Sequence, residues 1–265
     1  MKSKKTKAIN FPKLITGICA IGCFLALWYW GTREGTSLHR FMPNPTDVIK
    51  RLYYMMTNKV GPLTIWGHML NSVRRVLVGF VIASLSGIVL GLGMGWNRTI
   101  EAIFRPIFEI FRPIPPLAWI SIAIVWFGLG EGGKYFIIFV SGFSNVTINV
   151  YTGAKSVDPE LIGAAKMLGC SDRKIFTTVV IPSSVPYIFT GLQIAISSSW
   201  AAVVAAEMVR STNGIGWLIT AGQSIGDITQ VMAGIVVIGI IGFILATVTR
   251  KIESKLCAWS RVSDE

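Results

Sequence analysis

The chain has 265 residues, of which 52% are hydrophobic and only 14% charged, and its mean hydropathy is +0.60. This composition leaves too little polar surface to cover a water-soluble globule of this size, which excludes a soluble enzyme and predicts a protein of the lipid bilayer. The formal net charge of +12 comes from basic residues that flank apolar runs, a pattern that favours contact with anionic lipid over nucleic acid.

The first apolar run covers residues 14–30 and follows a lysine-rich start. Such a start is also found in secretory signal peptides, but this run ends in Trp28, Tyr29 and Trp30 and has no small-residue cleavage site. We therefore predict a retained first span that runs from the cytoplasm to the outside. Cys19 and Cys23 share one face of it without a His or carboxylate nearby, so we interpret them as packing residues and not as metal ligands.

A turn-rich segment follows the first span and contains one short helix. Residues 43–47 read Pro-Asn-Pro-Thr-Asp, which sets up a helix start with Thr46 as the N-cap. The next residues form one apolar stripe: Val48, Ile49, Leu52, Tyr53 and Met56. We predict an amphipathic helix on the outer surface.

Five further apolar cores have the length of about 17 to 25 residues that crosses about 30 Å of hydrocarbon. They are residues 76–96, 107–127, 135–151, 188–208 and 231–248. Residues 210–229 are too short and too rich in glycine to span, so this segment is predicted to dip partly into the membrane. The predicted fold is an all-α integral membrane protein with six transmembrane helices and both termini in the cytoplasm.

The distribution of basic residues supports this orientation. Fifteen Lys and Arg fall in predicted cytoplasmic segments and nine in predicted outer segments. Arg74 and Arg75 lie at the outer edge of the second span, where long side chains can snorkel towards water, and Arg112 falls inside the third span.

Residues 128–134, Gly-Leu-Gly-Glu-Gly-Gly-Lys, match a GxGxxG pattern and most of a phosphate-binding P-loop. A P-loop needs Ser or Thr after the Lys and a soluble strand and helix around it, whereas Tyr135 follows here between two spans. We interpret the motif as a glycine turn that joins the third and fourth spans. His39 and His68 are the only histidines and both fall on the predicted outer side, so no enzyme, cofactor or metal site is predicted in this chain.

The longest polar interruption in the second half is the loop of residues 152–187. Asp158 and Pro159 can open a helix, Gly169 can end it, and Ser171 can cap a second helix that runs to Ile181. A helical hairpin on the cytoplasmic face is the result. Three small residues in the first helix permit close approach by another protein: Gly163, Ala164 and Ala165. A helix that lies on its own bundle fits the same spacing equally well.

The order Ala164-Ala165, Gly169, Ile181-Pro182 resembles the EAA motif of permease subunits of bacterial ATP-binding-cassette (ABC) importers, with Gly163 in place of the motif's leading Glu. In that family the loop forms a coupling helix that fits a cleft in the ATPase subunit. The resemblance therefore implies that these six residues couple the chain to an ATPase, which binds the ATP. It also implies the type I importer permease fold, a second permease copy, two ATPase subunits, an external solute-binding protein and a place in the bacterial inner membrane.

Four other stretches narrow the branch within this binding-protein-dependent transport family. Residues 67–80, 112–119, 126–131 and 205–208 resemble permeases for nitrate, sulfonates, taurine and bicarbonate. Some members of the branch serve thiamine-precursor pyrimidines or other small heterocycles, so a small anion and a heterocycle are both expected cargoes. The predicted layout is a tail, first span and outer helix in residues 1–60, a permease core in 61–251 with the coupling loop 152–187, and a cytoplasmic tail in 252–265.

Polar residues inside the spans are candidates for the translocation pathway: Asn145, Asn149, Ser198 and Glu207. Asn and Ser also join neighbouring helices in ordinary bundles, and Glu207 can instead pair with Arg210. A secondary transporter or channel is the alternative from a different class. It would carry ion-coupling carboxylates in its spans or an internal repeat, for which Glu109 and Glu207 are weak evidence.

Overall fold

The computed structural model describes residues 11–36, 38 and 41–257. These residues form helices, and the only strand-like pairing among them is one antiparallel bridge between Val60 and Leu63. His39, the lysine-rich start and most of the predicted C-terminal tail lie outside the described residues.

Within the described residues, four helices are long and apolar enough to cross a membrane, and a bent pair makes a fifth crossing if it counts as one. The four are α3 (Ile65–Trp96), α6 (Glu131–Lys155), the continuous helix built from α8 (Asp172–Ile175), η3 (Phe176–Val180) and α9 (Ile181–Arg210), and α11 (Ile228–Leu256). The bent pair joins α4 (Arg98–Phe111) to η2 (Pro116–Trp119) and α5 (Ile120–Phe127). The remaining helices are α1 (Phe11–Gly31), α2 (Pro45–Thr57), α7 (Pro159–Met167) and α10 (Ile215–Ser224).

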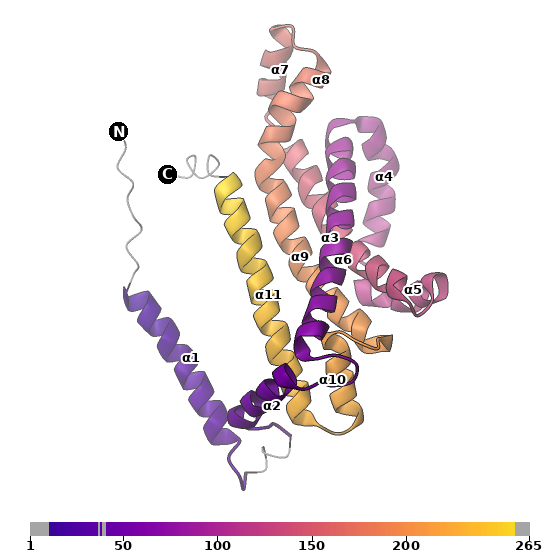
Figure 1. Ribbon diagram of the computed structural model, residues 1–265. Helices are drawn as coiled ribbons and strands as arrows, with labels where there is room; N and C mark the ends of the chain where they lie inside the picture. Colours follow the sequence, from indigo (N-terminus) through magenta and orange to yellow (C-terminus); the bar gives the residue numbers. More distant parts are fainter. Residues whose placement is uncertain (1–10, 37, 39–40, 258–265) are drawn as a thin grey trace.

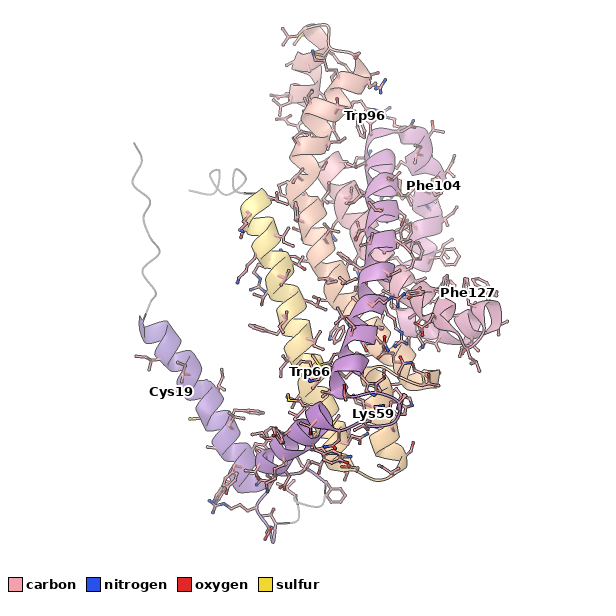
Figure 2. All side chains as sticks on the ribbon, in the orientation of Figure 1. Cys19, Lys59, Trp66, Trp96, Phe104 and Phe127 are labelled. Carbon is pink, nitrogen blue, oxygen red and sulfur yellow. The ribbon has the colours of Figure 1, made fainter. Side chains whose placement is uncertain are left out.

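The bundle is built around α3, α6 and α9, which run side by side, with α7 and α8 at one end and α2 and α10 at the other (Figure 1). Glycine lets α3 approach α6 closely, because a Cβ on Gly91 would stand 2.7 Å from the carbonyl oxygen of Thr147. Val146 and Val150 of α6 are fully buried in this contact. Figure 2 labels Trp66 and Trp96 near the two ends of α3, as expected of aromatic residues at membrane interfaces.

The third apolar segment, predicted over residues 107–127, is interrupted at its prolines, as their missing N–H groups lead us to expect. The helix begins at Arg98, and its two halves meet at an angle of 89° across residues 112–115. Pro113, Pro115 and Pro116 cause the break, because none of them has an N–H to donate to the carbonyl of the preceding turn. As a result α5 turns away from the axis of α4 and projects from the side of the bundle (Figure 1).

The second half of the coupling loop also differs from the prediction. No separate helix ends at Ile181 and no span starts at residue 188, because one helix continues from Asp172 to Arg210. The π turn η3 allows this. The N–H of Ile181 bonds to the carbonyl of Phe176, five residues earlier, so the hydrogen-bond register has shifted just before Pro182.

The outer helix α2 begins as expected but with a different cap and a different buried side. Asn44, and not Thr46, is the N-cap: its side-chain oxygen accepts a hydrogen bond of 3.1 Å from the N–H of Thr46. Val48 and Met55 are buried, whereas the predicted stripe members Ile49 and Tyr53 are exposed. The buried side is set by contact with the start of α11, where Arg51 forms an ion pair of 2.8 Å with Asp227.

The first helix stands apart from the bundle. Figure 1 shows α1 diverging from α11 towards the chain start, and it touches the rest of the described chain around α2. The indole N–H of Trp28 donates a hydrogen bond of 3.1 Å to the carbonyl of Pro43. Cys19 and Cys23 are exposed thiols, and no group of three potential metal ligands occurs among the described residues.

Candidate functional site

The first candidate site is α7, which forms as the sequence predicts. The Asp158 carboxylate accepts a hydrogen bond of 2.9 Å from the N–H of Glu160, and Pro159 occupies the first helical position. Gly169 follows the end of the helix with φ +78°, a left-handed conformation that glycine adopts without strain. Both helix signals, the N-terminal cap and the C-terminal glycine, are confirmed.

The tip of α7 is apolar and open. Met167 and Leu168 are 85% and 84% exposed, and a Cβ on Gly163 would meet no atom within 4 Å. Ile162 anchors the other side of the helix against the core that contains the buried Val157. The helix therefore rests on its own bundle along one side only and presents an uncovered apolar end (Figure 1).

The predicted coupling residues divide into two groups. Gly163, Ala164, Ala165 and Gly169 lie in or directly after α7, with Ala164 exposed and Ala165 half-buried. Ile181 and Pro182 lie on the continuous helix that follows, beyond the buried Ile175 and Val180. Lys166 and Asp172 form an ion pair of 3.3 Å across the intervening turn.

The second candidate site is a buried ion network at the opposite end of the bundle. Arg75 binds Glu131 through two hydrogen bonds of 2.7 Å and Glu207 through a third of 2.7 Å. The side chains of Arg75 and Glu207 are 4% and 0% exposed. The expectation that Arg75 snorkels to water is therefore wrong: two carboxylates compensate its charge inside the protein. The predicted partner of Glu207, Arg210, has a side chain outside those the structure describes.

This network holds the start of α10. The Glu207 carboxylate accepts hydrogen bonds from the Ser72 hydroxyl and from the N–H of Gly216, at 2.8 Å and 3.0 Å. His68 Nδ1 accepts from the N–H of Gly214 at 3.0 Å. The first N–H groups of a helix have no partner within it, so side chains of α3 and α9 satisfy those of α10. Gly214 has φ +113°, and a Cβ there would collide with the Glu207 carboxylate.

The glycine-rich motif contributes to the same network. Gly128 makes the turn with φ +70°, which confirms the glycine turn between the third and fourth apolar segments. Lys134, the residue that a P-loop would offer to phosphate, is buried and donates to Glu131 at 2.8 Å and to Ser211 at 3.0 Å. Its ammonium group is thus committed to an ion pair and a hydroxyl.

Three of the stretches singled out in the sequence meet in this network. His68, Ser72 and Arg75 come from residues 67–80, Glu131 from residues 126–131 and Glu207 from residues 205–208. This convergence was not predicted from the sequence. The available signal was Glu207 itself, because a carboxylate inside a span needs a counter-charge and Arg75 is the basic residue predicted at the same membrane face.

Three of the four residues predicted for the pathway form one chain of hydrogen bonds, and Glu207 lies apart from them. The side-chain amide of Asn145 donates to the Ser198 hydroxyl at 3.0 Å and so joins α6 to α9, while that of Asn149 donates to the carbonyl of Asn145 at 2.8 Å. Glu207 belongs to the buried network at the end of the bundle opposite α7. A role of these residues in translocation stays a prediction.

Residues 83–254 match the family of the binding-protein-dependent transport system inner membrane component. The chain is 35% identical to the taurine transport system permease protein TauC of Escherichia coli over 91% of this chain and 88% of that protein. It is 33% identical to the nitrate import permease protein NrtB of Synechocystis over 96% and 93% of the two chains.

Two further similarities extend this set. The bicarbonate transport system permease protein CmpB of Synechococcus elongatus is 37% identical over 66% of this chain and 63% of its own length. Among solved structures, the inward-facing MetNI methionine ABC transporter superposes with a TM-score of 0.56 at 20% identity, over 69% of this chain and 93% of that chain. At this identity the structural likeness concerns the fold.

Proposed function

The chain belongs to the binding-protein-dependent transport system inner membrane component family, and from that membership we propose that it is the permease subunit of an ATP-driven importer for a small anionic solute. It is an ABC transporter permease of the inner membrane and not an enzyme. Relatives named for nitrate and bicarbonate support an anionic cargo over a heterocycle, and one named for taurine supports a cargo with an anionic sulfonate group. Family membership likewise favours an ABC importer over a secondary transporter or channel.

The proposal depends on one observation, the open apolar tip of α7. Met167 and Leu168 have no cover from the described part of the chain, and the small residues before them leave room for a partner's backbone. We infer that a separate ATPase subunit, which binds the ATP, docks here through Gly163, Ala164, Ala165 and Gly169. Ile181 and Pro182 then transmit the movement of α7 to the long helix α9.

The remaining parts of the assembly follow from the same proposal. Six spans result if α1 and the bent pair of α4 and α5 each count as one crossing, and both termini and α7 then lie on one side of the membrane. The excess of Lys and Arg in these segments supports the cytoplasm as that side. Two copies of the chain would enclose the pathway, with two ATPases on the α7 side and a solute-binding protein on the α2 and α10 side.

Co-purification tests the proposal. A tagged chain from its native host should bring down an ATPase subunit and support ATP-driven uptake of nitrate or taurine in proteoliposomes. Ala164→Asp places a charge in the small-residue surface and should abolish both uptake and co-purification. Thr99→Asp is the matched control, because it adds the same charge at an exposed position in the first turn of α4, where a carboxylate is tolerated. Full uptake by the Ala164→Asp variant would refute docking at α7.

A further inference from the structure

The helix α4 carries charged residues along one side, although it belongs to the bent pair that counts as a crossing. They recur every three or four residues: Arg98, Glu101, Arg105, Glu109 and Arg112. The side chains of Arg105 and Glu109 are 53% and 64% exposed and form an ion pair of 2.9 Å. Lipid tails cannot solvate such side chains, so this side of α4 must face water or protein.

Arg112 differs from Glu101, Arg105 and Glu109 because its charge has no partner among the described residues, and it differs from Arg98, which also has no ion pair there, by its depth along the helix. Glu101 binds Lys155 at 2.7 Å, and Arg105 binds Glu109. The Arg112 side chain has no ion pair or hydrogen bond to any described residue. It follows α4 at the proline break, 14 residues from Arg98, which corresponds to a depth of about 20 Å along the helix. An uncompensated cation at such a depth is a mark of a functional position.

Arg112 also lines an aromatic cleft of about 310 Å³ between α4 and α6. The walls are mainly phenylalanine: Phe104, Phe108 and Phe111 from α4 and Phe136, Phe139 and Phe143 from α6. Figure 2 labels Phe104 on α4 at this side of the bundle. Two more polar groups reach the lining, the Ser144 hydroxyl and Trp119, whose indole N–H has no hydrogen-bond partner. An apolar cleft with a few polar groups is typical of a small-molecule site.

We propose that this cleft binds the transported solute, an organic anion whose sulfonate or carboxylate group pairs with Arg112 while its apolar body contacts the aromatic walls. This inference rests on the proposed function as a permease. The exposed charged side of α4 supplies the aqueous path, and Arg112 stands where that path meets the cleft. A bare inorganic anion such as nitrate would pair with Arg112 but would gain nothing from the walls.

A titration of the permease–ATPase complex in nanodiscs of zwitterionic phosphatidylcholine tests the site. Ethanesulfonate, butanesulfonate, hexanesulfonate and nitrate are the probes, with empty nanodiscs as the baseline for partition into lipid. We expect saturable binding that tightens about fourfold for each added CH2 group, and nitrate to bind more weakly than butanesulfonate. Saturable binding with no dependence on chain length would overturn the proposal.

Variants assign the binding to named groups. Arg112→Gln should raise the Kd for hexanesulfonate about tenfold or more, and Trp119→Phe about threefold, because they remove a charge and one N–H donor. Arg112→Lys keeps the charge and should stay within about threefold of the wild type, which separates the effect of charge from that of side-chain shape. Trp119→Phe carries the test if the Gln variant fails to fold. Arg33→Gln, an equal loss of charge on the exposed turn after α1, should leave the Kd unchanged. An unchanged Kd in Arg112→Gln or Trp119→Phe would contradict the assignment.

A lipid headgroup is the competing source of the same chemistry, and anionic phosphatidylglycerol in the nanodiscs distinguishes the two. If hexanesulfonate binds equally in both kinds of disc, the solute assignment holds. If phosphatidylglycerol abolishes binding, the cleft is a lipid site and the proposal fails. Co-purification of the ATPase and uptake are measured on the wild-type chain and report the permease function wherever the solute binds, so failure of the cleft and failure of the permease function give different results.

Discussion

Arg75 is the most heavily bonded side chain at the end of the bundle opposite α7, and its replacement should reveal what the network contributes. Arg75→Met leaves Glu207 buried without a counter-charge, because Arg75 is its basic partner. Glu131 still keeps Lys134 as a partner. We expect a loss of about 3 to 5 kcal/mol of unfolding free energy, measured by denaturant titration in detergent micelles.

Two comparisons sharpen that measurement. The double variant Arg75→Met/Glu207→Gln should recover part of the loss, because no buried carboxylate then lacks compensation. Arg74→Met is the control, because Arg74 precedes Arg75 on α3 but is exposed. This substitution should change the unfolding free energy by less than about 0.5 kcal/mol. Equal effects of Arg74→Met and Arg75→Met would show that the network adds nothing specific.

At this scale the sequence indicates which residues need partners but not which ones they find. A carboxylate in an apolar helix requires a counter-charge, yet Arg75 lies 132 positions from Glu207. The nearby Arg210 looked equally suitable, because spacing within one helix is the only geometry that a sequence displays. The choice of Arg75 depends on how α3 and α9 are placed side by side.

Among the elements, the contact of α3 with α6 depends on small residues. Gly91→Ala would place a Cβ 2.7 Å from the carbonyl oxygen of Thr147 and 2.8 Å from Val150 Cβ, so the helices must separate. We expect a loss of about 1 to 3 kcal/mol of unfolding free energy, read from the shift in the denaturation midpoint.

A second helical glycine provides the matched control. Gly239 lies in α11 with no atom within 4 Å of where a Cβ would stand. Gly239→Ala should be neutral or stabilising by up to about 1 kcal/mol, because alanine restricts the unfolded chain and favours helix. If both substitutions behave alike, close packing at Gly91 does not matter.

Elements were predictable wherever local chemistry decides their ends. Asp158, Pro159 and Gly169 act on neighbouring residues, so the bounds of α7 follow from the sequence. The prolines at 113, 115 and 116 predict an interruption of the third apolar segment, because they lack an N–H group, but they do not predict the angle of 89° between its two halves. The continuous α8–α9 helix was not predicted, because a π turn accommodates Pro182 and has no clear sequence signal.

The whole molecule separates two tasks at its two ends. At one end α7 presents an apolar tip, and at the other a buried ion network holds α10 against α3 and α9. Between them, α4 bends at a proline break beside an unpaired arginine. This division suits a permease that receives energy on one side of the membrane and solute on the other.

The most direct test of this account places a photocrosslinking amino acid at Leu168, at the tip of α7, in cells that express the whole transporter. Ile225 is the control site, because it is 72% exposed, against 84% for Leu168, and follows α10 at the opposite end. The account predicts a crosslink to the ATPase subunit from Leu168 and none from Ile225. A crosslink to the ATPase from Ile225, or the absence of a crosslink from both positions, would contradict the account.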